Sequence, residues 1–251
     1  MGKNYCYPEG TRKIIVQNSS IERPEIFQKA VEIIDGLNEK NDEARRYQSL
    51  LLRCNQDGKV EGGLLEKYQP HPTFNNLTDK ILGQEYSYSP NGFFQINLPV
   101  YEMALSHIKK HIKTNKVLDL YSGVGTIGLS VAEERELTLV ESNKAAYQEL
   151  VKNCERSISF TNPPRPILAK SEECLEYIAP DQTVILDPPR AGCDKKLLEK
   201  LLSEQPQKII YLSCNPATQA RDVSILQQKY IINDIISFNL PNSERDGYEG
   251  N

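Results

Sequence analysis

From residue 98 onward the chain alternates helical and strand-like patterns, and this alternation constrains the fold more than any other feature of the sequence. Apolar runs predict strands at 116–120, 137–140, 166–168, 183–186, 209–213 and 230–238. Amphipathic segments predict helices at 98–112, 126–134, 143–157, 172–178, 195–202 and 217–228. Strands that alternate with helices at this spacing form a parallel sheet with helices on both faces. We therefore expect an α/β fold with a mostly parallel, doubly wound, Rossmann-like sheet.

The first 90 residues follow a different pattern and predict a small α+β region. Apolar residues at helical spacing after Pro24 predict a helix over 24–37, because proline suits the first turn of a helix. The segments 48–54 and 59–65 flank an Asp-Gly turn and predict a β-hairpin. We therefore expect two parts, residues 1–90 and residues 91–251.

The composition excludes several classes of protein. No apolar run approaches the roughly 20 residues that a membrane span requires, and the N-terminal segment lacks the apolar core of a signal peptide. The six cysteines are scattered without a Cys-x-x-Cys pair, which argues against a disulfide framework or a metal site. These features favour the cytoplasm, where thiols stay reduced. The net charge of −4 argues mildly against nucleic-acid binding, although a local basic face is compatible with it.

A glycine-rich turn, Asp119-Leu-Tyr-Ser-Gly-Val-Gly125, connects a predicted strand to a predicted helix. Its glycines let the backbone approach a ligand at a helix N-terminus. The turn matches neither the dinucleotide fingerprint nor a phosphate-binding loop. Glu141 ends the next strand, where an acid can accept hydrogen bonds from both hydroxyls of a ribose. A solvated acid at a strand end is the alternative. A nucleoside cofactor without a pyrophosphate loop indicates S-adenosylmethionine.

The segment Ile209-Ile-Tyr-Leu-Ser-Cys-Asn-Pro-Ala-Thr218 ends a buried strand with a cysteine. Pro216 cannot continue a strand ladder, but it suits the first turn of a following helix. We therefore expect Cys214 on a strand-to-helix turn, with its sulfur exposed at the edge where open α/β sheets bind ligands. A buried, unreactive thiol is the alternative for an isolated cysteine.

A second loop, Asp187-Pro-Pro-Arg-Ala-Gly192, follows the strand predicted at 183–186, and its prolines fix the carboxylate at the sheet edge. This loop, the Cys214 segment and Phe93-Phe-Gln-Ile-Asn97 together resemble the motifs of the RNA uracil-C5 methyltransferases. These are class I, S-adenosylmethionine-dependent enzymes that make 5-methyluridine in tRNA and ribosomal RNA. The resemblance covers residues 86–238 well and the preceding residues only loosely.

The resemblance implies methyl transfer to C5 of a uridine in tRNA or rRNA through a covalent cysteine–C6 adduct. It implies that Cys214 is the nucleophile and that Asp187 holds the target uracil near the sulfonium. The implied cofactor-binding residues are Gln95, Tyr121, Gly123, Gly125, Thr126, Glu141 and Asp187. Asp187 could instead cap its own loop, and Gln95 and Tyr121 could be packing residues. Region 1–90 would then face the RNA.

Several basic residues are candidates for contacts with RNA phosphates. Arg190 and Arg221 lie near the two motifs, and solvated surface arginine is the alternative for both. Lys109, Lys110, His111 and Lys113 form a short basic stretch, for which a solvated helix end is the alternative.

The segment after Phe238 departs from the family pattern. The family's closing motif contains a threonine, a histidine and a glutamate that acts as the general base, and it precedes a last strand. The threonine and histidine are absent here, and Glu244 is the best candidate for the base, with a surface glutamate in a frayed tail as the alternative. The cysteine run that holds an iron–sulfur cluster in some members, and an N-terminal oligonucleotide-binding barrel, are also absent from the sequence.

Two other functions stay compatible with this sequence. One is a degenerate family member that binds cofactor or RNA without efficient turnover. The other is a methyltransferase that acts on another substrate. The sequence specifies neither the RNA, nor the uridine, nor the oligomeric state.

Overall fold

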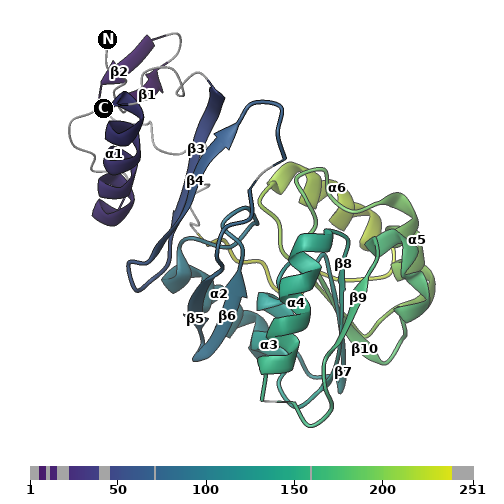
Figure 1. Ribbon diagram of the computed structural model, residues 1–251. Coiled ribbons are helices and arrows are strands. Elements are labelled where there is room, and N and C mark those ends of the chain that lie inside the picture. The colour runs from purple at the N-terminus through teal and green to yellow at the C-terminus, as the bar shows by residue number, and fades with distance from the viewer. Residues whose placement is uncertain are drawn as a thin grey trace. The chain divides into compact units, whose positions relative to one another are not determined.

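The computed structural model describes residues 6–9, 12–15, 23–39, 46–70, 72–158 and 160–238. The chain divides into two compact units, both drawn in Figure 1. The first contains the described residues up to Asp79 together with Ser87–Phe93. The second contains Lys80–Tyr86 and the described residues from Phe94 onward. The two-part division at residue 90 stays a prediction.

The first unit contains a helix and two antiparallel hairpins. Its elements are β1 (Cys6–Glu9), β2 (Arg12–Ile15), α1 (Pro24–Glu39), β3 (Tyr47–Cys54) and β4 (Val60–Glu66). β1 pairs with β2 and β3 pairs with β4, and α1 packs on β3 and β4. The predicted helix and hairpin are therefore confirmed. Gly58 in the hairpin turn has a φ of 84°, a left-handed conformation that glycine adopts without strain.

A further hairpin contributes residues to both units. It pairs β5 (Leu77–Ile81) with β6 (Gln84–Tyr88), and its turn contains Leu82 and Gly83, both with positive φ. After β6 ends at Tyr88, the chain continues without a strand to α2.

The second unit is built on a five-stranded sheet in the order β11-β10-β7-β8-β9. The strands are β7 (Lys116–Leu120), β8 (Glu136–Glu141), β9 (Arg165–Leu168), β10 (Gln182–Leu186) and β11 (Lys208–Tyr211). Every neighbouring pair is parallel. The predicted α/β fold with a parallel, Rossmann-like sheet is therefore confirmed.

Helices cover both faces of this sheet because alternate residues of a strand point to opposite faces. The helices are α2 (Leu98–His111), α3 (Thr126–Val131), α4 (Lys144–Arg156), α5 (Lys195–Glu204) and α6 (Pro216–Leu226), with short 3₁₀ turns η2 (Ser171–Glu173) and η3 (Leu175–Tyr177). On one face, Leu118, Val184 and Leu186 form a core with leucines of α5 and α6. On the other face α3 lies against β7 and β8, and α4 packs along β8 and β9 (Figure 1).

Three predicted elements differ from the structure. β11 ends at Tyr211, before the predicted end at 213, and the helix predicted at 172–178 consists of the 3₁₀ turns η2 and η3. The strand predicted at 230–238 is wrong for the described chain: this segment has the apolar content of a strand, but no described strand pairs with it. A strand requires a partner as well as a pattern, and Ile231 and Ile235 are instead 82% and 81% exposed.

Every helix in the described part of the chain is too short or too polar to cross a membrane.

Candidate active site

Four loops with polar or reactive side chains leave the same edge of the parallel sheet. The last register pairs join the ends of β7 and β8, of β7 and β10, and of β10 and β11. Because these strands are parallel and end in register, their carboxyl ends meet at one edge, which is where open α/β sheets bind ligands. The first residues after these strands are Tyr121, Ser142, Asp187 and Leu212. The sheet therefore brings the glycine turn, Glu141, Asp187 and the Cys214 segment to one edge.

Cys214 lies between β11 and α6, and its side chain is exposed. The hydroxyl of Ser213 donates a hydrogen bond to the main-chain oxygen of Asn215 and accepts one from its main-chain nitrogen, each at 3.0 Å. Asn215 caps α6 by accepting a hydrogen bond from the nitrogen of Ala217 at 3.1 Å. The backbone on both sides of the cysteine is therefore fixed, while the thiol itself faces solvent.

The Cys214 segment and the Asp187 loop are joined through one carbonyl group. The main-chain oxygen of Arg190 accepts hydrogen bonds from Nδ2 of Asn215 and from Oγ1 of Thr218, both at 3.1 Å. Asp187 at the start of this loop is partly buried, and burial raises the pKa of its carboxyl group to about 6. The two sequence motifs thus form one connected structure, with a carboxyl group and a thiol on adjacent loops.

The two glycines of the glycine turn have different surroundings. Gly123 has a φ of 57°, and a Cβ atom placed on it would meet nothing within 4 Å. Gly125 has a φ of 92°, and a Cβ atom there would lie 2.6 Å from Cδ1 of Leu150. Gly125 is therefore required by the packing of α4 against the turn, whereas the backbone of Gly123 borders open space that a ligand can occupy.

Glu141 is 9% exposed and is held by backbone groups on both sides. Its Oε2 accepts a hydrogen bond from the nitrogen of Gly123 at 2.8 Å, and its Oε1 accepts one from the nitrogen of Asn143 at 2.5 Å. These contacts fix the carboxylate beside the glycine turn. Each carboxylate oxygen can accept a further hydrogen bond, so the group can still bind a hydroxyl donor.

Comparison with known proteins finds a family that the C-terminal part of the chain resembles. Residues 175–243 match the family model for tRNA (uracil-5-)-methyltransferases, and this region contains both the Asp187 loop and Cys214. Over these residues the chain is similar to that family.

A solved structure and curated relatives agree with this similarity. The crystal structure of the Pyrococcus abyssi tRNA (uracil-54, C5)-methyltransferase in complex with S-adenosyl-L-homocysteine matches 80% of this chain and 60% of that one, at 25% identity and a TM-score of 0.67. An uncharacterized RNA methyltransferase of Prochlorococcus marinus is 33% identical over 70% of this chain and 46% of its own length. One from Mycoplasma mobile is 34% identical over 65% of this chain and 45% of its own length. The chain therefore spans less than half the length of these two curated relatives.

Asp222 of α6 joins the loops around the cysteine, a role that the sequence alone does not predict. Asp222 is fully buried. Its Oδ2 accepts hydrogen bonds from the nitrogen of Cys193 at 2.8 Å and from the hydroxyl of Tyr211 at 2.7 Å, and its Oδ1 accepts one from Nε of Arg221 at 2.8 Å. The signal in the sequence was an acid in a predicted helix, which by itself indicates a solvent-facing residue.

Asp119 of β7 is a second residue that the sequence did not single out for a role. Its side chain is fully buried, and Oδ2 accepts a hydrogen bond from the nitrogen of Gly128 at 2.9 Å. No polar atom of the described residues hydrogen-bonds to Oδ1. The pKa of this carboxyl group is raised to about 8, chiefly by burial and to a smaller extent by the nearby carboxyl groups of Asp187 and Glu141, whereas the Gly128 contact lowers it. In the sequence, an acid within the apolar run of β7 is the feature that could have indicated a buried carboxyl group.

The structure places the other predicted cofactor residues in varied surroundings. Tyr121 has a φ of 62°, and its ring packs against the core formed with α5 and α6. Gln95 is partly buried, and its Oε1 accepts a hydrogen bond from the nitrogen of Ile96 at 3.0 Å. Oγ1 of Thr126, the first residue of α3, lies 3.1 Å from the hydroxyl of Tyr101. Their contacts with a cofactor stay predictions.

The charged candidates also differ from one another. Arg221 donates to Asp222 and to the main-chain oxygen of Ala191, so its guanidinium group holds the loop together. Arg190 is exposed. Lys109 of the basic stretch forms an ion pair with Glu133 at 2.6 Å. Glu244, the candidate general base, lies outside the described residues.

Proposed function

We propose that the protein transfers a methyl group from S-adenosylmethionine to C5 of a uridine in tRNA or rRNA, through a covalent bond between Cys214 and C6 of the base. The observation that carries this proposal is the exposed thiol of Cys214 on a loop that shares the Arg190 carbonyl with the Asp187 loop. A thiol nucleophile and a carboxyl group at the ligand-binding edge of an α/β sheet are the groups that this chemistry requires.

The residues of the glycine turn fit the cofactor. Gly123 offers backbone beside open space, and Glu141 offers a carboxylate held within reach of a ribose. The buried carboxyl group of Asp119, whose Oδ1 has no partner among the described residues, offers a hydrogen-bonding group next to the turn. Gln95, Tyr121, Gly125 and Thr126 complete the proposed site. S-adenosylmethionine, when bound, supplies an electrophilic methyl group. The Pyrococcus abyssi relative was crystallised with S-adenosyl-L-homocysteine, which supports the same choice of cofactor.

The main chemical difficulty of the reaction is that C5 of uracil is a poor nucleophile. The proposed role of Cys214 is to make C5 more nucleophilic. The thiolate forms a bond to C6, and the electrons of the C5–C6 double bond move toward C5 and the C4 carbonyl oxygen. C5 would then form a bond to the methyl carbon while the bond from that carbon to the sulfonium sulfur breaks and the sulfur keeps the electron pair. A base removes the proton from C5, the double bond returns, and the sulfur–C6 bond breaks to release Cys214.

Asp187 is proposed to hold the base during these steps. As a carboxylate it can accept a hydrogen bond from N3–H of uracil and so orient C6 toward the thiol. Its partly buried position lowers the local dielectric and strengthens that bond. Glu244 is proposed as the base that removes the C5 proton. A chain without an effective base would form the adduct and fail to resolve it.

RNA is the proposed partner, with tRNA supported by the family model and by the relative from Pyrococcus abyssi. The exposed Arg190 beside the cysteine is proposed to contact a phosphate. All cysteines whose side chains the structure describes are free, which supports a reaction in the reducing cytoplasm.

Trapping on RNA that contains 5-fluorouridine tests the proposal. Fluorine cannot leave C5 as a proton does, so the adduct accumulates and migrates as a protein–RNA complex in a denaturing gel. The wild type should form this complex only when S-adenosylmethionine is added, and Cys214→Ala should not form it. Cys54→Ala, which removes a thiol of the other unit, is the matched control and should behave as the wild type.

Two other results would argue against methyl transfer to uridine by this protein. Absence of the complex with every tRNA and rRNA tested would contradict the uridine chemistry. A complex with ordinary uridine RNA, without 5-methyluridine in the nucleosides, would support binding without turnover.

A further inference from the structure

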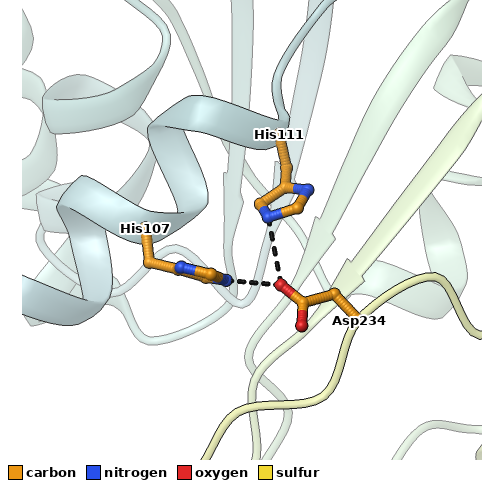
Figure 2. A group of neighbouring side chains, drawn as sticks. All are labelled: His107, His111 and Asp234. Atoms are coloured by element: carbon orange, nitrogen blue, oxygen red, sulfur yellow. Dashed lines mark hydrogen bonds and ion pairs between the residues drawn. The ribbon is translucent and has the colours of Figure 1, made fainter.

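Two histidines and an aspartate converge on the surface of the second unit, as Figure 2 shows. Nε2 of His107 lies 2.6 Å from Oδ2 of Asp234, and Nε2 of His111 lies 3.2 Å from the same oxygen. The three potential ligand atoms lie within 4.8 Å of one another. Both imidazole rings therefore point at one carboxylate.

The positions in the fold explain this convergence. His107 and His111 lie four positions apart on α2, so they lie one above the other on the same face of the helix. Asp234 comes from the segment after α6, whose isoleucines are exposed and which no described strand pairs. The ring of Phe238 packs edge-on against His107, with centroids 6.4 Å apart. The histidine face of α2 is thus the anchor of this segment.

We propose that His107, His111 and Asp234 form a binding site for a divalent transition-metal ion, with Zn²⁺ as the best match. Two imidazole nitrogens and one carboxylate oxygen are a common zinc ligand set, and the fourth position is left for water. Zinc–ligand distances of about 2.0–2.2 Å place ligand atoms ~3.3 Å apart in a tetrahedral site. The nitrogen–oxygen distances of 2.6 and 3.2 Å lie below this spacing, and all three ligand atoms lie within 4.8 Å of one another, so side-chain rotations would bring them to the tetrahedral spacing.

The surroundings allow an ion to enter and to stay. The three side chains are between 28% and 40% exposed, so an ion reaches them from solvent without opening the fold. Lys109, which also lies on α2, forms an ion pair with Glu133 at 2.6 Å. Lys110 and Lys113 repel a cation and so weaken the site. The site would join α2 to the segment around Asp234 and is independent of the proposed methyl transfer.

Zinc binding to the metal-free chain tests the site directly. The protein is treated with a chelator, which is then removed, and Zn²⁺ is titrated in competition with a chromophoric chelator. One Zn²⁺ per chain should bind to the wild type, and its melting temperature should rise. His107→Ala and Asp234→Asn should each weaken Zn²⁺ binding by at least about tenfold. Removing a group that only hydrogen-bonds to a metal ligand already lowers metal affinity by about tenfold or more, and removing a ligand itself should cost more.

Two controls keep the test decisive. Cys214→Ala, which removes the exposed thiol, should bind Zn²⁺ as the wild type does. Asp234→Asn keeps the size of the side chain and an acceptor oxygen, so its folding, checked by circular dichroism, separates loss of ligand from loss of structure. Co²⁺ substitution should give the visible absorption of a nitrogen- and oxygen-liganded ion. Equal binding by the wild type and by His107→Ala, or binding that disappears in Cys214→Ala, would overturn the proposal.

Discussion

The carboxylate of Asp222 accepts a hydrogen bond from the hydroxyl of Tyr211 at 2.7 Å, and so connects α6 to the last residue of β11. The same oxygen holds the nitrogen of Cys193, which follows the Asp187 loop. Cys214 lies on the connection between Tyr211 and α6. One buried carboxylate therefore fixes the relative positions of the proposed nucleophile and the loop that is proposed to hold its substrate.

Asp222→Ala should slow adduct formation on 5-fluorouridine RNA, because it releases both loops. It should also lower the free energy of unfolding by about 3 kcal/mol, since the buried hydroxyl of Tyr211 and the nitrogen of Cys193 lose their acceptor. Asp222→Asn keeps one acceptor oxygen and should recover part of both losses. Urea unfolding and single-turnover trapping measure the two effects. Ser224→Ala, an exposed change on the same helix, is the control, and an unchanged trapping rate in Asp222→Ala would contradict the positioning role.

The two glycines of the glycine turn should respond differently to alanine. Gly125→Ala places a Cβ 2.6 Å from Leu150 and should destabilise the fold by a few kcal/mol, on the order of an overpacked core. Gly123→Ala meets open space, so its cost is limited to the left-handed backbone, about 1 kcal/mol. Gly123→Ala should nevertheless weaken S-adenosylmethionine binding, because the alanine side chain would occupy the space proposed for the cofactor. Calorimetric titration and thermal unfolding of both variants check this; unchanged cofactor affinity in a folded Gly123→Ala would exclude Gly123 from the site.

The buried carboxyl group of Asp119 should make stability depend on pH. Its folded pKa of about 8 lies above the ordinary value of about 3.9 for the unfolded chain. The stabilisation is therefore complete below pH 4 and is lost as the pH rises through 8, where the buried group must ionise. Asp119→Asn cannot ionise. The free energy of unfolding of this variant minus that of the wild type should increase between pH 5 and pH 8, by at most about 1.4 kcal/mol per pH unit. A constant difference across this range would show that Asp119 does not titrate there.

Asp187 should give the trapping reaction a second pH dependence. Its pKa of about 6 means that the carboxylate form, which accepts N3–H of the base, predominates only above that pH. Protonation of Asp187 should therefore contribute a fall of about tenfold per pH unit below pH 6 to the rate of adduct formation. Asp187→Asn keeps an acceptor oxygen without a titrating group, so its slower reaction should lack this component. Parallel pH profiles for the two proteins would contradict the assigned role.

The sequence predicts the parallel sheet and its ligand-binding edge because both follow from local periodicity and from the turns that end each strand. The glycine turn, Asp187 and Cys214 were found for the same reason: each directly follows a buried apolar run. The strand predicted at 230–238 is wrong because a strand must pair with a neighbouring strand. The apolar pattern around Ile231 and Ile235 carries no information about whether such a neighbour exists. Asp222 and the group of His107, His111 and Asp234 depend on contacts between distant segments. His107 and His111 were visible as a helical pair, but Asp234 is 127 residues from His107 and has no local signal.

The position of the covalent bond decides whether Cys214 is the nucleophile. The complex trapped on 5-fluorouridine RNA is digested with protease and nuclease, and the modified peptide is sequenced by mass spectrometry. We expect a methylated fluorouridine nucleotide on the sulfur of Cys214 and on no other residue. A nucleotide attached to a different cysteine, with Cys214 unmodified in the same complex, would contradict it.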